Sequence, residues 1–189
     1  MSRIEIRICG FGGQGIIMSG RIIGMAAAIY EGKQATFNQS YGPEARGSAC
    51  SAQIVVADEL IHYPYVSHSD ILVAMSQEAY QKFETEVVKD GLLLLEQDLV
   101  KISKLRASLR AFSIPATRIA ENLGRKIIAN IVMLGFFTAM SDLFKRESMQ
   151  EAMLSCIPKG TEHLNLKAFS SGYEYGLDLK KIQAEAVAG

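Results

Sequence analysis

The sequence predicts an α/β domain with a mixed, mostly parallel β-sheet and with helices collected toward its C-terminal end. Charged residues alternate with isoleucine from Arg3 to Cys9, which is the period-2 pattern of a strand. A glycine-rich turn follows at once, and apolar residues then return at helical spacing from Ile16 to Tyr30, before a stop at Gly32. This order of strand, glycine loop and helix is typical of a Rossmann-like, three-layer domain.

The remaining strands are predicted from short apolar runs. Gln34–Ser40 and Cys50–Ala57 are separated by a loop with no room for a helix, which favours antiparallel pairing because a parallel crossover needs a dozen or more residues. Three more strands are predicted at Asp70–Met75, at Leu92–Glu96 after an Asp-Gly turn, and at Phe112–Pro115.

Cap residues and apolar periodicity predict the helices of the second half. Ser76 is expected to cap a helix that ends near Val88, and Thr117 a short one that ends at Gly124. Lys126–Leu143 is apolar around its circumference, so this helix is either buried or meets another chain. The last two helices begin with a capping box at Ser148–Glu151, before Pro158, and at Thr161, the latter ending near Leu177.

Length and charge restrict the classes of function. We expect residues 1–189 to form one domain, with an ordered core of about 3–177. Lys and Arg number 20, as do Asp and Glu, so the net charge is zero, which argues against nucleic-acid binding. Apolar residues make up 49% of the chain, and an apolar protein without net charge tends to associate, so we expect a subunit.

Neither a metal site nor a catalytic residue is predicted. Cys9, Cys50 and Cys156 form no CxxC pair and cannot by themselves build a zinc site or an iron–sulfur cluster. Their odd number, with no signal peptide, favours the cytoplasm. The most apolar later stretch, Ile127–Met140, is too short for a membrane span.

The glycine loop is the sharpest candidate for a binding site. Its sequence satisfies G-x-G-x-x-G, and glycines allow a phosphate to approach the backbone at a helix N-terminus. The second strand carries no acidic residue to bind a ribose, so NAD is not predicted. A tight turn packed against protein is the equal alternative. The candidate contacts are Gly10, Gly12, Gly13, Gln14 and Gly15.

The loop Tyr41–Ser48 is the second candidate. Gly42, Pro43 and Gly47 restrict its shape, and Arg46 on such a loop can bind a phosphate or a carboxylate. A solvated turn carrying opposite charges is the alternative.

The two loops in this order resemble the gamma subunit of 2-oxoacid:ferredoxin (acceptor) oxidoreductases. The motifs are Gly10-Phe11-Gly12-Gly13-Gln14-Gly15 and Tyr41-Gly42-Pro43-Glu44-Ala45-Arg46-Gly47, and the resemblance extends from about Arg3 to Leu177. Ser48 departs from the glycine of many members. The form of the second loop is most similar to the chains that serve 2-oxoglutarate; pyruvate and branched-chain 2-oxoacid enzymes are close relatives.

The resemblance implies an enzyme that converts 2-oxoglutarate and coenzyme A to succinyl-coenzyme A and carbon dioxide, with electrons passing to ferredoxin or a similar acceptor. It places thiamine diphosphate on the alpha and beta subunits and iron–sulfur clusters on partner chains, including a ferredoxin-like delta subunit. The gamma chain is expected to bind no cofactor alone, to be inactive alone, and to help complete the coenzyme A site. A scaffold subunit without a ligand and a free-standing nucleotide-binding oxidoreductase are the alternatives.

Overall fold

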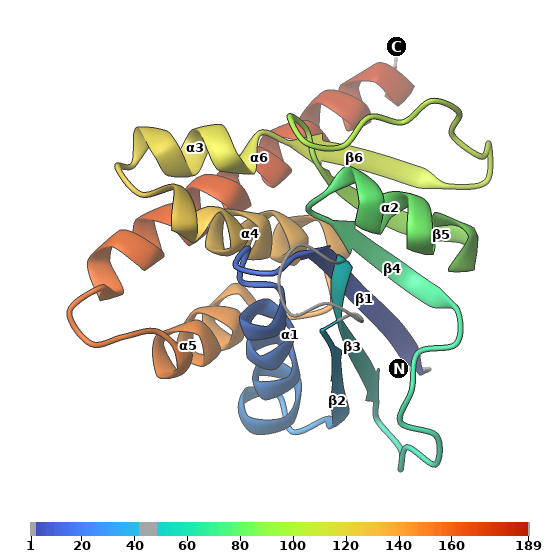
Figure 1. The fold of residues 1–189 in the computed structure, drawn as a ribbon, viewed down its shortest axis with the longest axis horizontal. Helices are drawn as coiled ribbons and strands as arrows, with labels where there is room; N and C mark the ends of the chain where they lie inside the picture. Colours follow the sequence, from blue (N-terminus) through green and yellow to red (C-terminus); the bar gives the residue numbers. More distant parts are fainter. Residues whose placement is uncertain (1–2, 42–48, 189) are drawn as a thin grey trace.

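Six strands form one mixed sheet in the computed structural model of the chain, in the order β2-β3-β1-β4-β5-β6 (Figure 1). The structure describes residues 3–41 and 49–188. Among these residues, β3 alone runs against the other strands, because it pairs antiparallel with both β1 and β2 while β1, β4, β5 and β6 pair in parallel. The mixed, mostly parallel sheet is therefore confirmed. The strands are β1 Ile4–Phe11, β2 Gln34–Ser40, β3 Ala49–Ala57, β4 Ser69–Ala74, β5 Val87–Glu96 and β6 Arg110–Ile114.

Helices cover the two faces of the sheet unequally (Figure 1). One face packs against α1, α3, α4, α5 and α6, and the other against α2, which gives the three layers expected. A π-helical turn, Ala26–Tyr30, continues α1, and 3-10 turns follow α2 and precede α4. The helices are α1 Ile16–Met25, α2 Gln77–Phe83, α3 Ala116–Asn122, α4 Ala129–Ser141, α5 Arg146–Cys156 and α6 Glu162–Ala188. Within the described part of the chain, no helix combines the length and apolar character that crossing a membrane requires.

The run of four leucines in β5 shows how the two faces are filled. Leu92 and Leu94 point into the core shared with α1 and α4, while Leu93 and Leu95 point into the smaller core under α2. A strand that is buried on both faces has no polar face, and this is why its sequence shows a continuous apolar run without alternation.

Helix α4 is buried within the chain itself. All twelve residues from Ala129 to Met140 are buried. A Cβ added at Gly135 would overlap the Phe169 carbonyl of α6, and one added at Gly172 would overlap the Val132 carbonyl of α4. The two helices therefore meet backbone to backbone. Of the two interpretations of this apolar helix, burial inside the domain is the correct one for α4.

The main error of secondary structure concerns the segment after α2. Ser76 caps this helix as predicted, since its hydroxyl accepts a hydrogen bond from the Ala79 N–H at 3.4 Å. The helix ends at Phe83, however, and not near Val88, because Val87 begins β5. The predicted Asp-Gly turn is an irregularity inside this strand, with Asp90 at a φ of 62°.

Three predicted helix ends are also wrong. Thr117 lies inside α3, whose N-cap is Pro115, and Ser148 is the third residue of α5, which has Lys145 as its N-cap. Distant carboxylates supply the missing caps: Glu96 accepts from the Thr117 N–H at 3.0 Å, and Glu31 from the Lys145 N–H at 2.7 Å. Helix α6 continues past the predicted end at Leu177 to Ala188.

Candidate functional site

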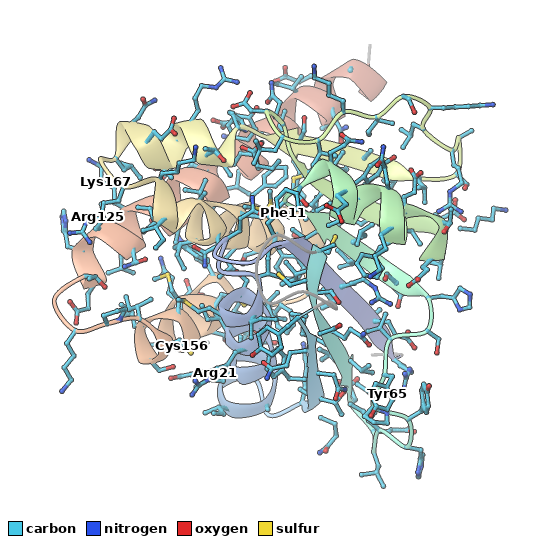
Figure 2. The ribbon with its side chains drawn as sticks, in the orientation of Figure 1. Phe11, Arg21, Tyr65, Arg125, Cys156 and Lys167 are labelled. Atoms are coloured by element: carbon cyan, nitrogen blue, oxygen red, sulfur yellow. The ribbon has the colours of Figure 1, made fainter. Side chains whose placement is uncertain are left out.

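The candidate site lies at the sheet edge where β1, β4, β5 and β6 end. Figure 2 shows Phe11, the last residue of β1, at this edge and Tyr65 at the opposite end of the sheet. Strand β3 begins at the same edge, since Ala49 pairs with Phe11. Tyr41 follows the end of β2 there as well, so the flanks of both predicted loops meet at one edge. Arg46 itself lies outside the described residues.

The glycine loop divides into packed and open positions. A Cβ on Gly10 would lie 2.5 Å from the Gln14 Oε1, and one on Gly15 would overlap the Asn130 amide. Added Cβ atoms at Gly12 and Gly13, by contrast, would meet nothing within 4 Å. Gly13 and Gly15 have φ angles of 90° and 74°, which favour glycine. Gly10 and Gly15 are thus needed for packing, while Gly12 and Gly13 leave backbone open to a ligand.

The Gln14 side chain stabilises the glycine loop through two hydrogen bonds. Its Oε1 accepts a hydrogen bond from the Phe11 N–H at 2.7 Å, and its Nε2 donates to the Met75 carbonyl at 2.9 Å. Both ends of the side-chain amide are therefore engaged with the ends of β1 and β4. These two hydrogen bonds hold the loop in shape, and since Gln14 also lines the groove described below, its contact with a ligand stays a prediction.

A groove opens beside the loop, with a volume of about 360 Å³. Residues of five segments that are far apart in the sequence form its wall. They are Gly13, Gln14, Met75, Leu99, Thr117, Lys126, Ile127 and Ala129. The side chains of this set are mostly apolar, with one lysine, and the set includes no carboxylate.

The electrostatics of the groove favour an anion. Helix α1 begins at the glycine loop and α4 begins at Ala129, so the positive ends of two helix dipoles face the groove. Neither helix has an acidic residue in its first turn or a side-chain cap at its N-terminus. The Lys126 Nζ is paired with the Glu121 Oε1 at 3.3 Å, and the Lys126 side chain is 71% exposed, so this cation is accessible.

Asn130 ties the start of α4 to the glycine loop. This buried amide has its Nδ2 3.5 Å from both the Gly15 carbonyl and the Ser19 hydroxyl. Asn130 was not predicted as a site residue, and neither were Lys126 and Leu99. A single polar residue inside a long apolar helix was the available signal for Asn130; nothing in the local sequence marks Leu99 or Lys126.

The cysteines near the site are buried thiols. Burial raises the pKa of Cys9 and also that of Cys50, which keeps both protonated at neutral pH. Across residues 3–41 and 49–188, no three His, Cys, Asp or Glu side chains come together in a way that could hold a metal ion. The described part of the site thus offers backbone N–H groups, one cation and apolar surface, which are groups for binding.

Comparison with known proteins decides the family. Residues 5–175 match the family described as pyruvate ferredoxin/flavodoxin oxidoreductase. The chain belongs to this family. This chain is also similar to the 2-oxoglutarate synthase subunit KorC of Methanocaldococcus jannaschii, with 49% identity over 179 residues, or 94% of this chain and 96% of that protein. The resemblance seen in the two loops is thereby confirmed.

Solved structures of the oxidoreductase family share the fold. The gamma subunit of the keto/oxoacid ferredoxin oxidoreductase from Geobacter sulfurreducens matches with a TM-score of 0.84 and 37% identity, covering 94% of this chain and 98% of that one. The 2-oxoglutarate:ferredoxin oxidoreductase of Magnetococcus marinus matches with a TM-score of 0.85 over 94% of this chain but only 32% of its own. At 21% identity, this second match shows the fold alone.

Proposed function

We propose that the chain is the gamma subunit of a 2-oxoglutarate:ferredoxin oxidoreductase and that it helps to bind coenzyme A. The complex would convert 2-oxoglutarate and coenzyme A to succinyl-coenzyme A and carbon dioxide, with two electrons passing to the acceptor. The 49% identical relative is named as a subunit of 2-oxoglutarate synthase, which supports this substrate over pyruvate or branched-chain 2-oxoacids.

The meeting of the glycine loop, Lys126 and the start of α4 in one groove carries the proposal. Coenzyme A has a diphosphate and a 3′-phosphate, which suit helix N-termini and a lysine. It also has an adenine ring and a pantetheine arm, which suit the apolar Met75, Leu99 and Ile127. The open backbone at Gly12 and Gly13 allows a phosphate to approach closely. This chain would bind and orient coenzyme A, and would exclude water from its apolar parts.

The partners follow from the same proposal. The relatives are subunits of larger oxidoreductases, so other chains complete the enzyme. We assign thiamine diphosphate to the alpha and beta subunits, and iron–sulfur clusters to partners that include a ferredoxin-like delta subunit. When bound there, these groups supply the decarboxylation and the transfer of electrons. We place the complex in the cytoplasm and treat residues 1–189 as one gamma-type domain.

A comparison of two half-reactions tests the proposal. Arg46→Ala and Gly13→Val are introduced into the assembled enzyme, and the KM for coenzyme A is measured with saturating 2-oxoglutarate. Loss of the charge-assisted hydrogen bond in Arg46→Ala costs roughly 1.5–3 kcal/mol, so its KM should rise about tenfold or more. Gly13→Val should raise the same KM, because its side chain blocks the backbone and strains a residue with a φ of 90°. Decarboxylation without coenzyme A, followed as a single burst of carbon dioxide, should stay near wild type.

The other outcomes identify the alternatives. If both half-reactions fall together while the complex stays assembled, the loops shape the subunit interface or the decarboxylation site. If neither changes, the chain is a scaffold that contacts no ligand. Turnover by the isolated chain, or binding of a nicotinamide nucleotide to it, would instead support a free-standing oxidoreductase.

A further inference from the structure

Glu96 is a fully buried carboxylate at the end of β5. Its exposed fraction is 0%, and it directly follows four leucines that fill the two cores. A carboxylate in such a place is costly unless hydrogen bonds compensate for the lost water. The Glu96 Oε2 accepts from the Asp98 N–H at 2.8 Å and from the Leu99 N–H at 2.7 Å, and the Oε1 accepts from the Thr117 N–H at 3.0 Å.

The segments that Glu96 holds form the groove wall that faces the glycine loop. Leu99 and Thr117 both line this groove, and they belong to different parts of the chain, the turn after β5 and the first turn of α3. Helix α3 has no capping bond from its own N-cap, Pro115. The Glu96 carboxylate therefore joins these two segments to each other and to the end of the sheet from the buried side, while the Asp98–Arg118 ion pair bridges them on the surface.

We infer that Glu96 is a positioning residue for coenzyme A, which rests on the function proposed above. It does not line the groove and so does not touch the ligand. It sets the distance of Leu99 and Thr117 from Lys126 and from the glycine loop. Without its three hydrogen bonds, the turn after β5 and the start of α3 can separate, and the groove loses its shape before the fold is lost.

Glu96→Gln in the assembled enzyme tests this inference. Glutamine preserves the size of the side chain but turns an amide NH₂ toward N–H donors, so at least one of the three hydrogen bonds is lost. We expect the KM for coenzyme A to rise about five- to tenfold, with kcat and the KM for 2-oxoglutarate within twofold of wild type. Titration of the assembled variant with coenzyme A alone should show the same loss of affinity.

Asp98→Asn provides the matched control. The Asp98 side chain pairs with Arg118 on the surface, 2.6 Å away, whereas Glu96 is bonded to the Asp98 backbone N–H. The Asp98–Arg118 pair also joins the turn after β5 to α3, but an ion pair this exposed contributes little, so this control should leave the KM for coenzyme A unchanged. If Glu96→Gln prevents folding, Glu96→Asp is used, because it keeps the charge and shortens the reach; it should raise the same KM.

The outcomes separate this inference from the proposed function. If Lys126→Ala raises the KM for coenzyme A but neither Glu96 variant does, the role of Glu96 is overturned while the groove stands. If the folded Glu96 variants lower kcat, or raise the KM values of both substrates alike, Glu96 is a structural residue only. If neither Lys126→Ala nor the Glu96 variants change the KM for coenzyme A, the proposed groove itself is wrong.

Discussion

Replacing Lys126 with alanine removes the cation of the groove at little cost to the fold. Lys126 and its partner Glu121 are 71% and 48% exposed, and an ion pair this exposed contributes roughly 0.2–1 kcal/mol. A charge-assisted hydrogen bond to a phosphate contributes roughly 1.5–3 kcal/mol. Because Lys126 must leave Glu121 to make that bond, the net loss in the variant is roughly 0.5–2.8 kcal/mol. This corresponds to a rise of roughly 2- to 110-fold in the Kd for coenzyme A.

The assay uses the assembled enzyme with saturating 2-oxoglutarate and acceptor. The KM for coenzyme A should rise in Lys126→Ala, while kcat and the melting temperature stay close to wild type. Glu121→Gln is the matched variant of opposite sign, because it frees Lys126 and should lower this KM by up to about fivefold. A wild-type KM in Lys126→Ala, or a shift of the same direction in both variants, would refute a phosphate contact at Lys126.

Three further predictions concern the loop and the fold. Gly12→Val adds a side chain where a Cβ meets nothing within 4 Å, so it should fold normally, and its KM for coenzyme A should rise at least about threefold if the ligand approaches there; an unchanged KM contradicts this. Gly172→Ala should destabilise the subunit by about 1–3 kcal/mol, seen as a lower melting temperature, since its methyl group overlaps the α4 backbone. Burial alone would raise the pKa of Glu31, but hydrogen bonds from Lys33 and Lys145 outweigh it and hold this pKa below the ordinary 4.5. Glu31 therefore stabilises the fold above pH 4.5, and this contribution is lost as the pH falls through the lowered pKa. Urea unfolding should show that Glu31→Gln has a lower free energy of unfolding than the wild type at pH 7, and that this difference shrinks below pH 4.5. A difference that does not depend on pH would contradict this.

The fold is predictable where its signals are local. The bounds Gln34–Ser40 of β2 agree residue for residue with the structure, because both ends are marked by turn residues. The start of β5 was assigned to a helix because Val87 and Val88 extend the apolar periodicity of α2. Only pairing with β4 makes this segment a strand, and that partner lies across the sheet. The N-caps predicted for α3 and α5 are wrong for a related reason. The carboxylates that cap these helices, Glu96 and Glu31, lie far from them in the sequence.

Half of the candidate site could be predicted in the same way. A glycine loop between a strand and a helix can be recognised from six consecutive residues. The other wall comes from single residues of separate segments, Leu99, Thr117 and Lys126, and no local motif connects them. The sequence does contain a signal for Glu96, because a lone carboxylate at the end of a four-leucine strand requires a hydrogen-bonding partner. The sequence does not show which groups bind this carboxylate, since every residue except proline carries a backbone N–H.

The direct contact of α4 and α6 has a consequence for folding during synthesis on the ribosome. Helix α4 ends at Ser141, but α6, which covers it through Gly135 and Gly172, is complete only at Ala188. At a synthesis rate of roughly 5–20 residues per second, the ribosome needs roughly 2–9 s to add this stretch. During these seconds, the face of α4 that packs against α6 has no cover from its own chain. Slow translation of the last helix therefore lengthens the interval in which two unfinished chains can aggregate.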